Sequence, residues 1–261
     1  MPRYLYPYDE ARSQGQLWTP DLITDLMAWY DPGDTHTVTV DESGNISQLL
    51  DKSGNGKTLT QADAATRPAY DANSWACGVP SIKWDYAANS KYLKSASLIT
   101  HQQVFIAGRY RDGVDTGTDG APYSGLFAGD TLYYGLLRIG TSTSWYNSPS
   151  ITSASRNGGP HVAESTFTAI PMPETIYSVK LSPQRSSAFT AGYDKFTVAE
   201  DRGWQGNITG IILTRDLLSQ REEDKIVGYM AWSLVKYGCT VLVDKLPASH
   251  RFKNRPPLIG D

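Results

Sequence analysis

The chain has 261 residues, of which 40% are hydrophobic and 11% aromatic, and its formal net charge is −3. Its 24 basic and 27 acidic residues form no basic block, which argues against nucleic acid as a partner. No stretch approaches the ~20 apolar residues that span a bilayer, and the segment after Met1 lacks the apolar core of a signal peptide. We therefore expect neither membrane insertion nor Sec-type export.

The N-terminal residues 1–16 are rich in Tyr, Pro and Arg and show no periodicity, which predicts an extended arm. Tyr4, Tyr6 and Tyr8 are amphipathic side chains of the kind that anchors protein interfaces, so they are our candidate partner-binding residues. The alternative is a disordered terminus without a partner.

A folded domain is expected over residues 17–245. Asp21–Leu26 predicts a helical turn with Thr19 as N-cap and Pro20 at the first helical position. Strand-like segments then recur without intervening helices, which is typical of an antiparallel sandwich rather than a parallel α/β sheet. These segments are 27–31, 36–40, 46–50, 81–84, 103–111, 132–139, 174–181, 194–199 and 207–214.

The segment Asp51–Gly56 has the Lys, Ser and Gly residues of a phosphate-binding loop, but it lacks the required spacing and the following helix. A tight turn explains the same residues, because Asp51 can accept a hydrogen bond from the backbone two residues later and Asn55-Gly56 tolerates positive φ. We predict a structural turn here.

One amphipathic helix is predicted over residues 219–237. Ser219 and Glu222 form a capping box at its start, and Gly238 is a left-handed terminator at its end. Its apolar face comprises Ile226, Met230, Ser233, Leu234 and Tyr237. We expect Glu223 and Lys225 to face solvent.

After the helix, Cys239–Val243 predicts one more strand, and the Pro-rich residues 246–261 predict an extended C-terminal tail. The only cysteines are Cys77 and Cys239, and their spacing fits no metal-binding or redox motif. Because disulfides persist mainly in oxidising compartments, the missing signal peptide predicts two reduced thiols.

Several short motifs, in this order, resemble the concanavalin A-like (laminin G-like) modules of bacteriophage virion and tail proteins. They are WTP (18–20), LMAWYD (26–31), DKSGNG (51–56), RPAY (67–70), GWQGNITGIIL (203–213), LSQRE (218–222), KIVGYMAW (225–232) and LPASHRFKN (246–254). Residues 112–170 match little. The resemblance implies an all-β fold, a two-sheet antiparallel jelly-roll sandwich, and a role in adhesion or glycan binding. It implies no single activity, because this fold hosts lectins, glycosidases and structural proteins.

Glycosidase relatives of this fold carry paired carboxylates at alternate positions of one strand, where one attacks and the other protonates the leaving oxygen. This sequence has no such run, and the adjacent Glu200 and Asp201 would point to opposite faces of a strand. The GxSxG, HExxH and P-loop motifs are also missing. We therefore predict that the protein is not an enzyme.

Two loops contain candidate binding residues. Asp112, Asp115 and Asp119 lie in a Gly-rich loop and offer the oxygen ligands that Ca²⁺ prefers, but their spacing is not that of an EF-hand and favours a solvated loop without a metal. Trp145, Tyr146 and Asn147 have the aromatic face and amide of a shallow glycan site, or else Trp145 fills the rim of the sandwich. Five other tryptophans are expected in the core: Trp18, Trp29, Trp84, Trp204 and Trp232.

The resemblance, with the missing catalytic motifs, implies a non-enzymatic virion component that decorates a capsid or is associated with a tail or fibre. Its expected partners are other virion proteins or further copies of itself. The resemblance implies a trimer for such a homo-oligomer, and host-surface polysaccharide is a further expected contact. No cofactor is expected apart from the Ca²⁺ candidate. The alternatives are a dedicated lectin-like receptor-binding module and, third, a glycan hydrolase with an unrecognised site. Assembly would take place in the host cytoplasm.

Overall fold

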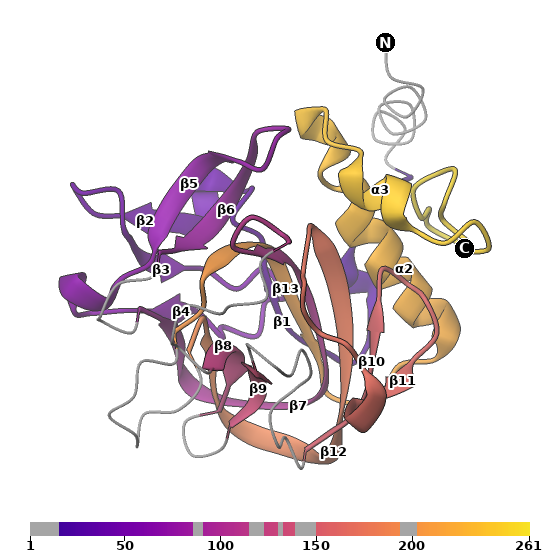
Figure 1. Cartoon of the computed structure of the whole chain (residues 1–261), viewed down its shortest axis with the longest axis horizontal. Helices are drawn as coiled ribbons and strands as arrows, with labels where there is room; N and C mark the ends of the chain where they lie inside the picture. The colour runs from indigo at the N-terminus through magenta and orange to yellow at the C-terminus, as the bar shows by residue number, and fades with distance from the viewer. Residues whose placement is uncertain (1–15, 86–90, 115–122, 130–132, 139–149, 194–202) are drawn as a thin grey trace.

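The computed structural model describes residues 16–85, 91–114, 123–129, 133–138, 150–193 and 203–261. Within these ranges the protein is mainly antiparallel β-structure, with one long helix near the C-terminus (Figure 1). The strands are β1 (Leu26–Tyr30), β2 (Val38–Val40), β3 (Ile46–Leu49), β4 (Leu59–Thr60), β5 (Ala69–Ser74), β6 (Val79–Trp84), β7 (Leu93–Tyr110), β8 (Tyr123–Ala128), β9 (Tyr133–Arg138), β10 (Ile151–Arg156), β11 (Val162–Ala163), β12 (Thr175–Ala191) and β13 (Gly206–Thr214). The helices are α2 (Gln220–Trp232) and α3 (Val241–Lys245), and 3-10 turns span Pro20–Leu22, Thr35–Thr37, Ala64–Thr66, Glu164–Thr166 and Val235–Tyr237.

The strands of the described residues join one hydrogen-bonded network whose main path runs β11-β10-β12-β7-β13-β6-β5. The two longest strands, β7 and β12, pair with each other along most of their length, and their register shifts between Lys180 and Arg185. On one side of this shift, β7 pairs with β4 and β12 pairs with β8. On the other side, β7 pairs with β13 and β12 pairs with β10. The network therefore curls along these two strands (Figure 1).

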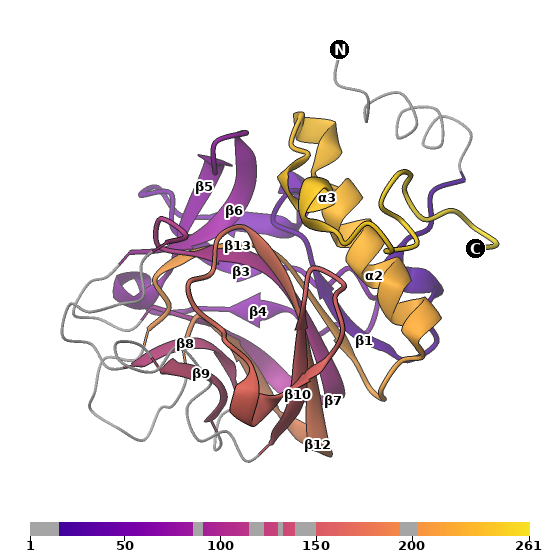
Figure 2. The same ribbon diagram turned by 45° about the vertical axis from the view of Figure 1, so that its right-hand side comes forward.

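Apolar residues on both faces of the central strands form two cores. Along β7, Val104 and Ile106 face the core enclosed by the curled sheet. Phe105 and Ala107 face a second core beneath α2 and α3, which cover the outer face of the sheet (Figure 2). This alternation follows from the two-residue period of a strand. The five tryptophans expected in the core are all buried, at 1–7% exposure: Trp18, Trp29, Trp84, Trp204 and Trp232.

The predicted turn at Asp51 is confirmed. Its carboxylate accepts hydrogen bonds from the backbone N–H of Ser53 at 2.9 Å, of Lys57 at 2.9 Å and of Trp29 at 3.0 Å. The third bond ties the turn to β1, so this one side chain joins two segments of the sheet. The helical turn predicted over Asp21–Leu26 is present in part, as the shorter 3-10 turn Pro20–Leu22 with Thr19 at its N-cap, and Leu26 already belongs to β1.

The start and apolar face of the predicted helix are confirmed. The Ser219–Glu222 capping box is formed, and Ile226, Met230 and Leu234 are buried. The α-helix is shorter than predicted, because it ends at Trp232 and continues as a 3-10 turn up to the left-handed Gly238. Within the described ranges, none of the helices combines the length and the apolar content that a membrane crossing needs.

The strand predicted over Cys239–Val243 is wrong, because Val241–Lys245 forms the short helix α3. Its Leu242 and Val243 are buried in the core that α2 covers, so packing against a helix overrides the β-propensity of these residues. The tail then returns across α2. The Trp232 Nε1–H donates to the Phe252 carbonyl at 2.8 Å. A β-carbon on Gly228 would lie 2.8 Å from the Phe252 ring, so this glycine permits the close approach.

The prediction of two reduced thiols is also wrong, because Cys77 and Cys239 form a disulfide with their Cα atoms 5.2 Å apart. Cys77 lies between β5 and β6, and Cys239 follows the turn that ends α2. The two residues are 162 positions apart in the sequence, and only the packing of the β5–β6 hairpin beside the C-terminal helices brings them together.

Candidate functional site

Most of the candidate site residues from the sequence lie outside the described residues. Asp112 is the exception: it is exposed, and its carboxylate accepts a hydrogen bond from the Val114 backbone N–H at 3.0 Å. In the described ranges, no group of three or more His, Cys, Asp or Glu side chains is placed to hold a metal ion. The calcium, glycan and arm residues that fall outside are Asp115, Asp119, Trp145, Tyr146, Asn147, Tyr4, Tyr6 and Tyr8. They stay predictions.

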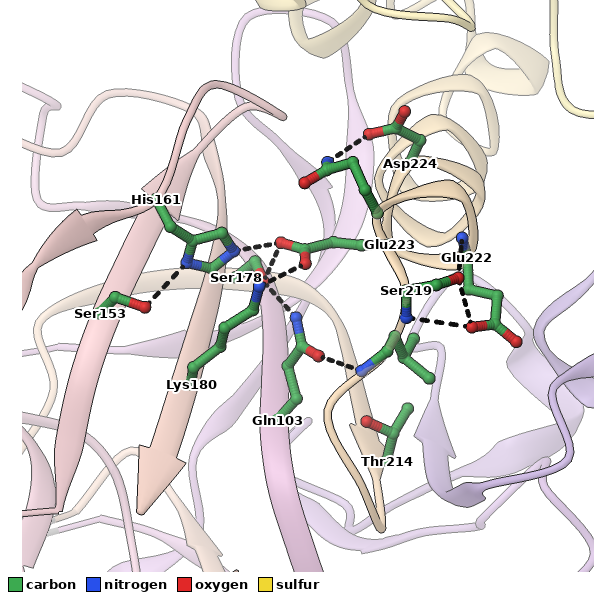
Figure 3. Close-up of polar contacts among 12 residues, drawn as sticks. Gln103, Ser153, His161, Ser178, Lys180, Thr214, Ser219, Glu222, Glu223 and Asp224 are labelled. Carbon is green, nitrogen blue, oxygen red and sulfur yellow. Dashed lines mark hydrogen bonds and ion pairs between the residues drawn. The ribbon is translucent and has the colours of Figure 1, made fainter.

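A buried charged cluster lies instead between the first turn of α2 and the sheet (Figure 3). Its centre is Glu223, which is 2% exposed, so the expectation that this residue faces solvent is wrong. The Glu223 carboxylate accepts hydrogen bonds from the His161 ring Nε2 and from the Ser178 hydroxyl, the latter at 2.8 Å. Its second oxygen pairs with the Lys180 ammonium at 3.0 Å. We call these four residues the Glu223 cluster.

Further hydrogen bonds extend the Glu223 cluster into the sheet and into the loop before α2. The Gln103 side-chain amide donates to the Ser178 hydroxyl at 2.9 Å, and its carbonyl oxygen accepts from the Leu218 backbone N–H at 3.0 Å. On the other side, the His161 Nδ1 lies 3.3 Å from the Ser153 hydroxyl. The cluster therefore connects β7, β10 and β12 to the start of the helix.

The partners of Glu223 hold it in its ionised form. Burial alone would raise the pKa of Glu223, but hydrogen bonds and charges from His161, Ser178 and Lys180 outweigh that effect and lower the pKa to about 2. A buried carboxylate needs such compensation, because an isolated charge is costly to remove from water. The cluster is therefore an ion pair with hydrogen-bonded supports that fastens α2 onto the sheet.

The order Ser153–His161–Glu223 resembles a nucleophile, a base and the acid that orients the base. Two features distinguish it from a catalytic arrangement. Ser153 lies within β10 and is paired with β11 on one side and with β12 on the other. Glu223 is also shared with Lys180 and Ser178, so it is not dedicated to His161. The arrangement is better suited to holding elements together than to activating a serine.

The sequence contains a signal for Glu223 that our interpretation passed over. Glu223 precedes Ile226 by three positions and Met230 by seven, so it lies on the same helical face as these two buried residues. A charged residue on the apolar face of a helix predicts a buried partner of opposite charge. The identity of that partner, Lys180, is not readable from local spacing.

A second polar region is an open hollow of about 420 Å³ at the ends of β6, β7 and β13. We call it the basic hollow, because Lys83, Arg109 and Arg111 line it together with one acidic residue, Asp85. The side-chain amides of Gln205, in the loop before β13, and of Asn207, in β13, complete the polar lining.

A third region is a hollow of about 470 Å³ where β4 meets the start of β7, and we call it the neutral hollow. Gln61, Tyr92, Lys94 and Ser97 are among its lining residues. The Gln61 side chain is buried, and its Nε2 has no hydrogen-bond partner among the residues described. By contrast, the space between β1, β13 and α2 is only about 20 Å³ and is a small gap in the packing.

No family model, curated protein or solved structure matches the chain. We therefore infer the function from the sequence motifs and from the geometry of these polar regions.

Proposed function

We propose that this protein is a non-enzymatic structural component of a bacteriophage particle, built on a concanavalin A-like jelly-roll sandwich. It would decorate the capsid or belong to the tail or a fibre, and would touch glycan on the host surface. The proposal begins from the ordered motifs that resemble phage modules, several of which form turns and helices with defined contacts, such as the Asp51 turn and the Ser219 capping box.

The curled sheet supports the sandwich part of the proposal. β7 and β12 shift register in their middle, and the two sides of the shift have different partner strands. In a jelly roll, long strands that bend in this way contribute to two facing layers. The apolar residues of the inner core would then lie between those layers.

The observation that carries the non-enzymatic part is the composition of the Glu223 cluster. It is the described site that most resembles catalytic machinery, and its carboxylate is engaged by His161, Ser178 and Lys180 at once. In a catalytic triad the carboxylate serves to orient one histidine. Glu223 also accepts a hydrogen bond from Ser178 and pairs with Lys180, which supports a role in holding α2 on the sheet.

A dedicated lectin-like receptor-binding module is the second candidate, and the neutral hollow favours it. Hydroxyl, amide and aromatic groups around an open depression suit a neutral sugar, whose hydroxyls both donate and accept hydrogen bonds. The unbonded Gln61 Nε2 would donate to such a ligand. A glycan array with the isolated protein tests this candidate.

The test of the main proposal is mass spectrometry of purified particles from a phage that encodes the chain. We expect the protein at a fixed copy number per particle that survives gradient purification. Residues 1–16 contain Tyr4, Tyr6 and Tyr8. Deleting them should reduce incorporation of the protein into particles or lower the mass of its homo-oligomer, which we propose to be a trimer. If the protein is missing from washed particles, or if it releases reducing ends from host polysaccharide in a His161-dependent reaction, the proposal is wrong.

A further inference from the structure

The basic hollow concentrates positive charge on a protein whose overall charge is negative. Lys83, Arg109 and Arg111 line one depression together with a single carboxylate, that of Asp85, while the whole chain carries −3. The Asp85 carboxylate forms an exposed ion pair with the Lys83 ammonium at 3.2 Å, so three positive charges face one negative charge. Cationic walls around a depression focus the electrostatic potential inside it. The hollow therefore attracts an anionic group although the protein as a whole does not.

One buried hydrogen-bond donor at the hollow is unused. The Arg109 Nε–H has no hydrogen-bond partner among the residues described. A buried donor without an acceptor destabilises the folded state, so such groups are rare in native proteins and call for an explanation. An acceptor supplied by a ligand would satisfy the Arg109 donor.

The neighbouring strands fix the Arg109 guanidinium in place before any ligand arrives. Its Nη1 donates to the Glu174 carboxylate at 3.2 Å, and Lys245 holds Glu174 in turn with a 3.0 Å contact to the same carboxylate group. A β-carbon on Gly206, which has a φ of +143°, would lie 2.0 Å from the Arg109 carbonyl oxygen. This glycine lets β13 approach β7 closely at the hollow. A pre-positioned guanidinium loses little entropy when it binds an oxyanion.

We propose that the basic hollow binds the oxyanion group of an acidic saccharide, such as the carboxylate of a uronic acid. This inference rests on the proposed function, because it names the class of host glycan that the particle would contact. Arg109 and Lys83 would hold the oxyanion. The volume of about 420 Å³ lies within the usual range of ligand sites and suits a small saccharide unit.

The remaining lining favours a sugar over a free inorganic anion. The Asp85 carboxylate would repel a small multivalent anion, but it can accept hydrogen bonds from sugar hydroxyls. Gln205 and Asn207 carry amides that both donate and accept, which is what a ring with several hydroxyls requires. Both amide side chains are buried, and their partners in the structure, Arg111 and Ser81, fix their orientation.

The experiment is calorimetric titration of the full chain with a glucuronic acid oligosaccharide, a glucose oligosaccharide of equal length, inorganic phosphate and single-stranded DNA. We expect binding of the acidic saccharide alone, weakened by added salt because the contact is ionic. Lys83→Gln should weaken it about tenfold, as expected for the loss of one charge-assisted hydrogen bond. Arg109→Lys, which keeps the charge and removes the Nε–H donor, should weaken it by a similar factor.

Lys94→Gln is the matched control, because it removes one positive charge from the same sheet but in the neutral hollow. It should leave the affinity for the acidic saccharide unchanged. The Lys83 side chain is 42% exposed, so its replacement leaves the fold intact, and an unchanged melting temperature checks this. The inference is overturned if the wild-type protein does not bind the acidic saccharide, or if it binds the glucose oligosaccharide equally well. A preference for phosphate or DNA, or equal losses of affinity in Lys83→Gln and Lys94→Gln, would also overturn it. None of these outcomes bears on particle incorporation, which tests the proposed function separately.

Discussion

The Glu223 cluster and the basic hollow contain similar residue types but use them in opposite ways. In the cluster, the Glu223 carboxylate is 2% exposed, accepts a hydrogen bond from Ser178 at one oxygen and forms an ion pair with Lys180 at the other. In the hollow, the Arg109 Nε–H lacks a hydrogen-bond partner among the described residues, beside an open volume of about 420 Å³. Matched buried charges hold elements together, whereas unused donors beside open space provide a capacity to bind. The comparison separates the residues that maintain the fold from those that we assign to a ligand.

The disulfide connects these two regions. Cys77 lies at the turn of the β5–β6 hairpin, whose second strand carries Lys83 and Trp84 to the basic hollow. Cys239 follows the helix that carries Glu223. Removing the disulfide with Cys77→Ala and Cys239→Ala should therefore have the largest effect on stability. The chain-entropy model gives about 5 kcal/mol for so long a loop.

Urea denaturation with and without a thiol reductant measures this effect. The reduced wild-type protein should unfold at nearly the same urea concentration as the double variant. Identical unfolding of the oxidised and reduced wild-type proteins would mean that the disulfide contributes nothing.

Removing the centre of the Glu223 cluster should have the next largest effect. Glu223→Ala leaves Lys180 and His161 without their carboxylate in a buried site, which we expect to destabilise the protein by about 3–5 kcal/mol. Arg221→Ala is the control, because Arg221 is exposed on the same helical turn and its loss should change stability by less than about 0.5 kcal/mol. Equal free energies of unfolding for the two variants would contradict a role for the cluster in holding α2.

The apolar side of the same helix gives a comparison without charges. Leu234 is 6% exposed in the core between the C-terminal helices and the sheet. Leu234→Ala should destabilise the protein by about 2–5 kcal/mol through lost burial and a cavity, and this loss should not change between pH 7 and pH 3. A strongly pH-dependent loss, measured by denaturation at both values, would show that this core is coupled to the charged cluster.

Acid should weaken the Glu223 cluster itself. The pKa of Glu223 is about 2 in the folded protein and near 4.5 in the unfolded chain, so its stabilising contribution is complete above pH 4.5. The contribution is lost as the pH falls through the folded value, and it amounts to about 3 kcal/mol. Glu223→Gln should make stability less dependent on pH between 5 and 2. An unchanged pH profile in that variant would mean that other carboxylates account for the acid sensitivity.

Much of the fold could be predicted from local sequence patterns. The contacts between distant segments could not be predicted in this way. The Ser219 capping box and the Asp51 turn depend on neighbours within a few residues, so their side chains and spacing identify them. The Cys77–Cys239 disulfide and the α3 helix depend on how the C-terminal segment packs, which no local spacing encodes.

The two polar regions show the same limit. Glu223 was identifiable as a residue on the apolar face of the helix, but its partner Lys180 comes from a strand about 40 positions earlier. The basic hollow combines β6, β7 and β13, which are separated by long stretches of sequence. The residues that we proposed from composition alone, such as Trp145 and Asp115, lie in segments outside the described residues.

The most direct test of the difference between the two regions is urea denaturation of Glu223→Gln and Lys83→Gln, each with and without an acidic saccharide. A ligand that binds only the folded state raises the free energy of unfolding by about 2.7 kcal/mol at a hundredfold excess over Kd. We predict that Glu223→Gln lowers stability but keeps this ligand-dependent increase. Lys83→Gln, with its tenfold weaker binding, should keep the wild-type stability and lose about half of the increase at the same ligand concentration. The opposite pattern, or losses of both quantities in both variants, would contradict the separation of a structural cluster from a binding hollow.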